Sequence, residues 1–239
     1  MPTLLLTRPQ DSAEEFAKAA AWAGAVVISP LIEVALRPFD LPLPGEGVIF
    51  TSQHGVRALA ALTGRRDWPV WCVGPGTFAA AQALGFTQVH QGAGTADALI
   101  AELCAAPPDY PLVHIRGAHV VTDLAGRLSD AGLRARCVIG YDQMECPLNA
   151  AARDCLLRSG PVVLPVFSPR SARLLAQAWA ELTAPCAELH ALAISEAAAN
   201  GVGALPLASI WVAPTPDFAG MVQALTQVHA ALEPDRNPR

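Results

Sequence analysis

Short, continuously apolar runs alternate along the chain with longer segments whose apolar residues recur at helical spacing. Unbroken apolar runs are typical of strands buried on both faces of a parallel sheet. Ten runs are predicted to be strands: Thr3–Leu6, Ala25–Ile28, Val48–Phe50, Val70–Val73, Gln88–His90, Leu112–Ile115, Ala135–Ile139, Val162–Phe167, Ala191–Ile194 and Ser209–Val212. Helical patterns between them include Ala13–Ala23, Ala79–Leu84, Thr95–Leu103 and Val120–Ala131. The alternation predicts an α/β architecture with right-handed crossovers.

The residues that flank the helical patterns support these boundaries. Gly24, Gly85 and Gly132 each follow a helix and are expected to form left-handed C-terminal caps. Asp97 and Asp217 are expected to start helices, where a carboxylate offsets the helix dipole. The final segment, EPDRNPR, is expected to be a frayed end.

The βα units occur in two related copies. Aligning residues 4–28 with residues 112–136 places Arg8 on Arg116 and Gly24 on Gly132. Three further pairs follow in the same order: 48–59 with 165–175, 71–85 with 192–203, and 94–103 with 214–225. Repeated units predict two similar domains. Crevices in open α/β sheets lie at the carboxyl ends of strands, so the turns after the strands are the candidate sites.

Two arrangements of these domains remain open on the pattern alone. Proline and glycine are frequent in residues 37–47, and a second linker signal covers residues 142–148. Sequential halves would meet near residue 107, where APPDYP occurs. In the alternative, crossed arrangement, the first βαβ piece packs with the C-terminal half.

Composition and charge exclude several classes of protein. Of the 239 residues, 52% are hydrophobic and 15% charged, which argues against extended disorder. No apolar run reaches the ~18 residues that span a bilayer, and MPTLLLTRPQ lacks the features of a signal peptide. We therefore expect a cytoplasmic protein with no membrane partner. The net charge of −5 and the lack of a Lys/Arg cluster argue against nucleic-acid binding.

The cysteines and histidines give no metal signature. The six cysteines contain no C-x-x-C pair, and the six histidines contain no H-x-x-x-H. Because a zinc site needs closer ligand spacing, the cysteines are expected to be buried small hydrophobes in a reducing compartment.

The turn Gly74-Pro75-Gly76-Thr77-Phe78-Ala79 resembles a dinucleotide-binding G-x-G-x-x-G/A sequence. It is not in the first βα turn, however, and no acidic residue ends a strand about 20 residues later, as that fingerprint requires. Two interpretations remain open: a helix N-terminus that binds a phosphate or carboxylate through Gly74, Gly76 and Thr77, or a tight turn in which Thr77 caps the helix.

Two strand-to-helix turns occupy equivalent places in the two copies, Thr51-Ser52 and Ser168-Pro169-Arg170-Ser171. Neither serine lies in a G-x-S-x-G elbow, so a hydrolase nucleophile is not expected. The hydroxyls either cap helices or present donors to an anionic substrate.

Three further side chains end predicted strands. Arg8 and Arg116 are either structural or present guanidinium groups to a crevice, since Arg suits carboxylates and phosphates. Tyr141 is either an amphipathic residue at a domain edge or a neutral hydrogen-bond donor.

Taken together and in order, these turns resemble the uroporphyrinogen-III synthase family. The matching pieces run through nearly the whole chain: LLLTRP with Gly24 and Pro30, VIFTSQHGV, CVGPGTFAAAQALGF, the IRG at 115–117, the Tyr141 strand end, VFSPRSARLL, and Ala193-Ile194-Ser195. The most specific combination is the TRP start, the (T/S)S turn and the VG-x-x-T helix start.

The resemblance implies two similar doubly wound parallel-sheet domains, with flavodoxin-like lobes, joined by a two-stranded linker and separated by a cleft. One domain would comprise residues 1–36 and 147–239 and the other residues 41–141, with linkers at 37–40 and 142–146. It also implies a lyase of heme biosynthesis that needs no cofactor and no metal. Nothing in the sequence demands an oligomer, so a monomer is expected. The substrate would be hydroxymethylbilane, a linear tetrapyrrole polycarboxylate, which closes to uroporphyrinogen III with inversion of ring D through a spiro intermediate.

The resemblance also implies roles for the turn residues. Tyr141 matches the family's strand-end tyrosine and would assist departure of the hydroxyl. The substrate-binding residues would be Arg8, Thr51, Ser52, Gly74, Gly76, Thr77, Arg116, Ser168, Arg170, Ser171 and Ser195. Ser195-Glu196 departs from the Gly- and Thr-containing turn of many relatives, and Glu196 is a poor neighbour for a polycarboxylate. The competing interpretations are a bilobal binding protein that senses a small anion or tetrapyrrole, and a sugar- or nucleotide-binding α/β protein.

Overall fold

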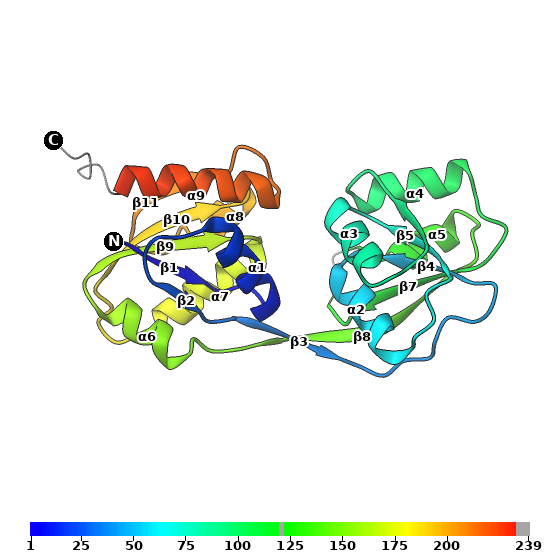
Figure 1. Cartoon of the computed structure of the whole chain (residues 1–239), viewed down its shortest axis with the longest axis horizontal. Helices are drawn as coiled ribbons and strands as arrows, with labels where there is room; N and C mark the ends of the chain where they lie inside the picture. Colours follow the sequence, from blue (N-terminus) through cyan, green and yellow to red (C-terminus); the bar gives the residue numbers. More distant parts are fainter. Residues whose placement is uncertain (120–121, 233–239) are drawn as a thin grey trace. The chain divides into compact units, whose positions relative to one another are not determined.

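The structure, a computed structural model, describes residues 1–119 and 122–232. The chain divides into two compact units (Figure 1). Unit 1 consists of Met1–Glu33 and the chain from Met144 onward, and unit 2 is the uninterrupted segment Val34–Gln143. The chain passes between the units twice, within strands β3 (Ile32–Leu36) and β8 (Ala135–Glu145), which are neighbours in one sheet.

Unit 1 is built on a five-stranded sheet in the order β11-β10-β9-β1-β2, and all its strand pairs are parallel. The strands are β1 (Thr3–Leu6), β2 (Val26–Ile28), β9 (Gly160–Val166), β10 (Ala187–Ala193) and β11 (Leu207–Val212). The first two strands of the chain therefore lie in one sheet with the last three.

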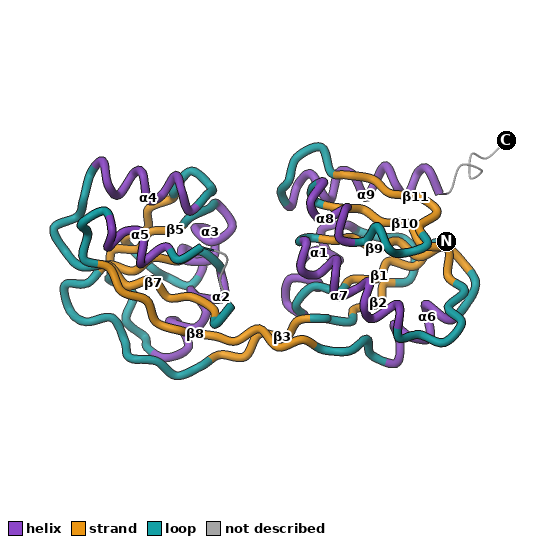
Figure 2. Tube along the Cα trace, turned by 180° about the vertical axis from the view of Figure 1, so that it is seen from behind, coloured by secondary structure: helices purple, strands orange, loops and turns teal. Residues whose placement is uncertain are grey.

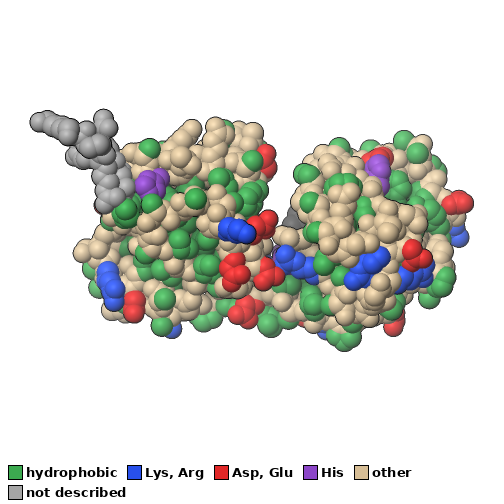
Figure 3. All heavy atoms as spheres, viewed as in Figure 1, with side chains coloured by type: hydrophobic (Ala, Val, Ile, Leu, Met, Phe, Trp, Pro, Cys, Tyr) green, Lys and Arg blue, Asp and Glu red, His purple; other side chains and the backbone are tan. Residues whose placement is uncertain are grey.

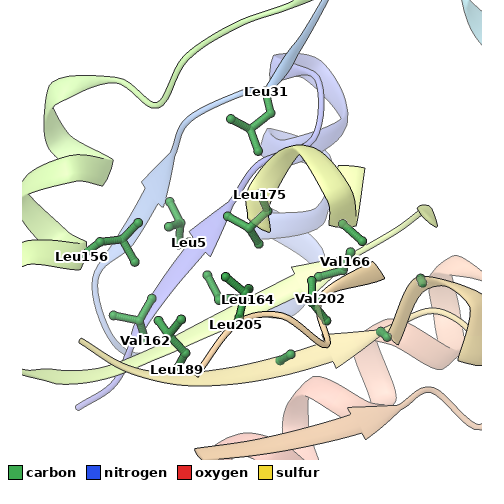
Figure 4. Close-up of a cluster of buried hydrophobic side chains, with 14 of the residues drawn as sticks. Leu5, Leu31, Leu156, Val162, Leu164, Val166, Leu175, Leu189, Val202 and Leu205 are labelled. Carbon is green, nitrogen blue, oxygen red and sulfur yellow. The ribbon is translucent and has the colours of Figure 1, made fainter. Parts of the chain in front are cut away.

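Helices cover both faces of this sheet, as the tube view shows (Figure 2). Residues of α1 (Gln10–Ala20) and α9 (Phe218–Leu232) share a core with Leu4 and Leu6. Residues of α6 (Ala150–Leu157), α7 (Pro169–Ala180) and α8 (Glu196–Gly201) share a second core with Leu5, part of which is drawn in Figure 4. The split follows from the alternation of side chains along β1, which sends Leu5 to the face opposite Leu4 and Leu6.

Unit 2 contains a six-stranded sheet in the order β3-β8-β7-β4-β5-β6, in which β4 to β8 pair in parallel. Its other strands are β4 (Gly47–Phe50), β5 (Pro69–Cys72), β6 (Gln88–Gln91) and β7 (Leu112–Gly117). One face packs against α2 (Gln53–Leu62) and α3 (Pro75–Ala83). The other face packs against α4 (Ala96–Ala105) and α5 (Leu124–Asp130).

The two sheets have the same strand order once the sequence repeat is taken into account. Aligning β1 with β7, β2 with β8, β9 with β4, β10 with β5 and β11 with β6 gives five strands in the order 2-1-3-4-5 in both sheets. That is the flavodoxin-like, doubly wound order. In unit 2, β3 is an additional edge strand next to β8. The predicted α/β fold class with two similar parallel-sheet units is therefore confirmed.

All ten predicted strands are present, but an eleventh, β3, was not predicted, and β8 continues to Glu145. Gly85 and Gly132 have the expected positive φ, whereas Gly24 does not. Helix α1 ends earlier, at Ala20, and Ala21 adopts the left-handed conformation instead. Gly24 is needed for a different reason, because a Cβ there would lie 2.3 Å from the Pro2 carbonyl oxygen.

Other expectations fall partly outside the structure or were wrong. The predicted helix Val120–Ala131 begins in residues that are not described, and its described part is α5. The tail 233–239 also lies outside the described residues. The cysteines are not uniformly buried hydrophobes: Cys72 is buried, Cys146 and Cys155 are half-buried, and Cys104, Cys137 and Cys186 are exposed.

Acidic and basic side chains are interspersed on the face shown in Figure 3. In the described part of the chain, no helix has the length and apolar character needed to cross a bilayer.

Candidate functional site in unit 2

A cavity of about 240 Å³ lies at the carboxyl ends of β4 and β7. These strands are neighbours, but the chain leaves β4 toward β5 on one side and β7 toward β8 on the other. Such a switch point is where open α/β sheets bind ligands. The cavity is lined by Thr51, Val73, Ala96, His114, Arg116, Gly117, His119, Thr122, Leu124 and Tyr141.

A break in strand register brings Tyr141 to this cavity. Residues 112–116 of β7 pair regularly with residues 135–139 of β8, but Gly117 pairs with Tyr141, so Gly140 is an extra residue in β8. One-residue bulges of this kind re-aim side chains next to functional sites. The Tyr141 ring then lies against Gly117, where a Cβ would be 2.8 Å from Tyr141 Cε2. Only glycine at position 117 leaves room for this ring position.

The phenol of Tyr141 is held as a neutral group. The residue is only 5% exposed, and burial raises the pKa of its phenol, while hydrogen bonding to Ser52 and to the Gly117 backbone acts in the opposite direction. Because the pKa lies above its ordinary value near 10, the hydroxyl keeps its proton at neutral pH and can donate a hydrogen bond.

Arg116 places a cation at the same cavity. Its Nη1 donates to the carbonyls of Gly117 at 2.9 Å and Ala118 at 3.3 Å, which fixes the guanidinium against the loop after β7. Within the described residues, no carboxylate pairs with this guanidinium. A planar, permanently charged fork with unused donors suits a carboxylate.

Thr51 and Ser52 join β4 to α2. Ser52 is the N-cap of α2, and its hydroxyl accepts a hydrogen bond from the His54 backbone N–H. Thr51 is exposed at the cavity, and its Oγ1 lies 3.1 Å from Nε2 of His114. Ser52 therefore caps the helix, and the adjacent Thr51 lines the cavity.

His114 and His119 also line the cavity and were not predicted as site residues. His114 is 2% exposed within β7. Burial, and secondarily the charge of Arg116, lower the pKa of its imidazole to about 4, although Asp123 acts in the opposite direction. The signal for His114 was a polar residue inside the apolar run LVHIRG. His119 follows the strand with no distinguishing pattern.

In the glycine-rich turn, the structure does not support the alternative in which Thr77 caps the helix. Gly74, and not Thr77, is the N-cap of α3, and no side chain caps this helix. Thr77 is buried within the first turn, whereas Gly76 is exposed. The open helix start at Gly74 and Gly76 can offer backbone N–H groups to an anion, but the Thr77 hydroxyl does not cap it.

In unit 1, Arg8 occupies the switch point between β1 and β9. Its guanidinium carbon lies 3.9 Å from the centre of the Phe167 ring. Burial lowers the pKa of Arg8, and its Nε and Nη1 are buried without a hydrogen-bond partner. This arginine corresponds to Arg116 in the repeat, but it is held by an aromatic ring instead of carbonyl groups.

The remaining predicted residues of unit 1 are engaged locally. Ser168 caps α7 by accepting from the Ser171 backbone N–H, and the two hydroxyl oxygens lie 2.9 Å apart. Arg170 lies 3.2 Å from the Glu145 carboxylate. Ser195 caps α8 by accepting from the Ala198 N–H. Capping therefore accounts for Ser168 and Ser195 without a ligand.

The structure brings Thr51, Arg116 and Tyr141 to one cavity, and Ser52 to the Tyr141 phenol. This set combines a cation, neutral hydroxyl donors and a helix start, so it can bind an anionic group and donate a hydrogen bond to it. In the described part of the chain, no three His, Cys, Asp or Glu side chains are grouped to hold a metal ion.

Comparison with known families identifies the origin of this arrangement. The model of the family described as uroporphyrinogen-III synthase HemD matches residues 14–223. The chain belongs to this family. The match extends over both units and includes every candidate site residue except Arg8. The predicted resemblance is therefore confirmed, and the chain is a member of an enzyme family linked to heme biosynthesis.

Solved structures of the family share the fold. A uroporphyrinogen-III synthetase from Helicobacter pylori is similar with a TM-score of 0.68 and 14% identity, over 95% of this chain and 100% of that one. A mutant uroporphyrinogen III synthase from the extremely thermophilic bacterium Thermus thermophilus gives a TM-score of 0.51 and 14% identity, over 97% and 100%. No curated protein matches the chain by sequence. At 14% identity, these similarities show a shared fold and no more.

Proposed function

We propose that this protein is a uroporphyrinogen-III synthase that acts on hydroxymethylbilane. In this reaction the terminal hydroxyl of the linear tetrapyrrole leaves as water, ring D inverts through a spiro intermediate, and the macrocycle closes as uroporphyrinogen III. The enzyme would be a hydro-lyase that works as a cytoplasmic monomer without a cofactor. The observation that carries the proposal is the Tyr141 phenol, buried as a neutral donor at the switch-point cavity of a family member.

The role proposed for Tyr141 is to assist departure of the hydroxyl. A phenol whose pKa is raised by burial keeps its proton and can donate a hydrogen bond to the leaving oxygen as the C–O bond breaks. Ser52, which is hydrogen-bonded to the phenol, is proposed to keep it oriented. Help of this kind is worth roughly 10²–10⁴-fold in rate.

The other residues are proposed to bind the carboxylates of the substrate. Arg116 and the Thr51 hydroxyl face the same cavity as Tyr141, and the α3 start at Gly74 and Gly76 offers backbone donors. In unit 1, the half-buried Arg8, whose Nε and Nη1 have no hydrogen-bond partner, is proposed as a further carboxylate ligand. Ser168, Arg170, Ser171 and Ser195 are retained as weaker candidates, because their groups already have partners.

Holding one ring against its neighbour is the larger part of the proposed catalysis. Closure without inversion needs no protein, so the enzyme must favour one geometry over another. Well-oriented intramolecular reactions gain up to roughly 7–11 kcal/mol from positioning. Several carboxylate contacts on fixed helix starts would supply such positioning.

The test is the identity of the product. Hydroxymethylbilane would be generated enzymatically in the presence of the protein, the products oxidised, and isomers I and III separated by chromatography. We expect type III product in proportion to the protein added. Type I product alone, at the rate seen without protein, would refute the synthase activity. Tight tetrapyrrole binding in that same experiment would support a non-catalytic binding protein instead.

A further inference from the structure

His114 is a buried histidine at the cavity for which the reaction above has no use. It lies in β7, lines the cavity, and places Nε2 3.1 Å from Oγ1 of Thr51. Thr51, in contrast, is exposed and sits at the start of the turn that leads to α2. The pair therefore connects the interior of unit 2 to a hydroxyl that a ligand can reach.

The two ring nitrogens of His114 have different surroundings. Nε2 faces the Thr51 hydroxyl, whereas Nδ1 is fully buried and has no hydrogen-bond partner among the described residues. The ring is uncharged at neutral pH because burial opposes its protonation. One nitrogen therefore carries a proton and the other carries a lone pair.

The surroundings decide which nitrogen carries the proton. A proton on Nδ1 would be a buried donor with no acceptor, and orphaned buried N–H groups are rarer than under-used acceptors. A proton on Nε2 is satisfied by Thr51 Oγ1 and leaves only a lone pair without a partner. The second arrangement is the less costly one.

This choice fixes the direction of the Thr51 hydroxyl. A hydroxyl that accepts a hydrogen bond from His114 Nε2–H keeps its own proton free to donate elsewhere. Since Thr51 is exposed at the cavity, that proton is available to a ligand there, and Arg116 lines the same cavity. A fixed donor beside a guanidinium suits a carboxylate.

We propose that His114 is a positioning residue: as the Nε2–H tautomer it donates to Thr51 Oγ1 and so fixes the Thr51 hydroxyl as a donor to one carboxylate of the substrate. The carboxylate ligand rests on the proposed function. The tautomer and the orientation of Thr51 do not, because they follow from contacts within unit 2.

The tautomer is tested first, in the full-length protein without substrate. In the ¹⁵N NMR spectrum of histidine-labelled protein at pH 7, assigned with a His114→Gln variant, we expect the His114 ring to be neutral and protonated at Nε2. Protonation at Nδ1, or a charged ring, would overturn the proposal whether or not the protein is a synthase.

The coupling to the substrate is tested with matched variants. His114→Gln keeps an amide N–H near the position of Nε2, whereas His114→Leu removes the donor. We expect His114→Leu and Thr51→Val each to raise KM for hydroxymethylbilane roughly tenfold, the loss expected for one hydrogen bond to a charged group, with little change in kcat. His114→Gln should keep KM near that of the wild type.

The double variant decides whether His114 acts through Thr51. If it does, His114→Leu combined with Thr51→Val should bind no more weakly than Thr51→Val alone. Multiplied losses in the double variant, or an unchanged KM in His114→Leu, would overturn the positioning role. If the wild type does not turn over hydroxymethylbilane, the proposed function fails, and the tautomer measurement alone then decides the orientation of Thr51.

Discussion

At the scale of single residues, burial changes the chemistry of the side chains around the cavity. Burial favours the uncharged form of both Tyr141 and His114: it raises the pKa of the phenol and lowers the pKa of the imidazole. Arg116, at the same cavity, donates hydrogen bonds to the loop carbonyls of Gly117 and Ala118. The cavity thus combines one cation with neutral donors.

Removing the Tyr141 hydroxyl tests its proposed role. Tyr141→Phe keeps the ring against Gly117 but removes the donor, so kcat should fall roughly 10²-fold or more, with the fold preserved. Turnover of hydroxymethylbilane and the isomer ratio are the measurements. The matched control is Tyr110→Phe, at the chain's other tyrosine, which should retain full activity. Equal rates for the two variants would contradict the role of Tyr141.

The low pKa of His114 predicts how stability depends on pH. In the unfolded chain the imidazole binds a proton near pH 6.5, but in the folded protein only near pH 4. The unfolded state therefore gains protons first, so the contribution of His114 is complete above pH 6.5 and is lost as the pH falls toward 4.

Between pH 7 and pH 4.5, where about two pH units of this range are crossed, the expected loss is roughly 2–3 kcal/mol, from 1.36 kcal/mol per pKa unit. Urea unfolding at pH 7 and at pH 4.5 gives the free energy of unfolding at each pH. The decrease between the two pH values should be larger for the wild type than for His114→Gln. The comparison with the variant cancels other groups, including His190, whose pKa is also lowered by burial. Parallel pH dependence in the two proteins would show that His114 titrates normally.

At the scale of elements, the site depends on how closely α2 approaches the sheet. Gly55 lies in α2, and a Cβ there would be 2.7 Å from the Ile115 carbonyl oxygen in β7 and 3.1 Å from Phe50 Cδ1. Because a strand backbone cannot yield as a side chain does, α2 must carry glycine at this contact.

Gly55→Ala should therefore destabilise the protein by about 1–3 kcal/mol, the usual cost of overpacking, even though alanine favours helix. Urea denaturation gives the measurement. Gly64→Ala is the matched control, since nothing lies within 4 Å of its Cβ and its φ is not positive. If both variants unfold at the same urea concentration as the wild type, α2 does not lie as close to β7 at Gly55 as described.

The sequence predicted strands that are buried on both faces, such as β4, and also more exposed ones, such as β6. Thr51, Arg116 and Tyr141 could be named because each follows a predicted apolar run, although the structure places Arg116 within β7 and Tyr141 within β8. β3 was missed because Glu33 interrupts the apolar residues of Ile32–Leu36, of which only Ile32 is buried. The bulge at Gly140 leaves no trace in the pattern, because it is defined by the partner strand.

Prediction of the site residues from the sequence was limited for the same reason, because the deciding contacts come from other parts of the chain. A capping serine such as Ser52 or Ser168 has the same local sequence whether it only caps a helix or also contacts a ligand, so sequence could not separate the two. His114 lies within a strand at no motif spacing, and its importance follows only from Thr51, which is 63 residues away in the chain.

At the scale of the whole molecule, the two units differ in continuity. Unit 2 is the single segment Val34–Gln143, whereas unit 1 needs both ends of the chain. In unit 1, β1 pairs with β9 and contributes Leu4, Leu5 and Leu6, which are fully buried.

This difference predicts how fragments behave. Residues 34–143 should fold alone, whereas residues 144–239 alone should not, because they lack the strands that cover β9. Dispersion of ¹H–¹⁵N NMR spectra would distinguish the two, and adding a peptide of residues 1–33 should restore structure to the second fragment. A well-dispersed spectrum for residues 144–239 without the peptide would contradict this division.

Because unit 1 is formed from two separated parts of the chain, it can be completed only late in synthesis. A ribosome that adds about 5–20 residues per second needs roughly 5–20 s to produce the Val34–Gln143 segment after the first strands have emerged. During that interval β1 can pair with β2, but its other neighbour, β9, has not been made, while the later-made unit 2 completes first. Each new molecule therefore passes through a stage in which unit 2 is folded but β1 still lacks its neighbour β9. Aggregation would compete with folding at that stage.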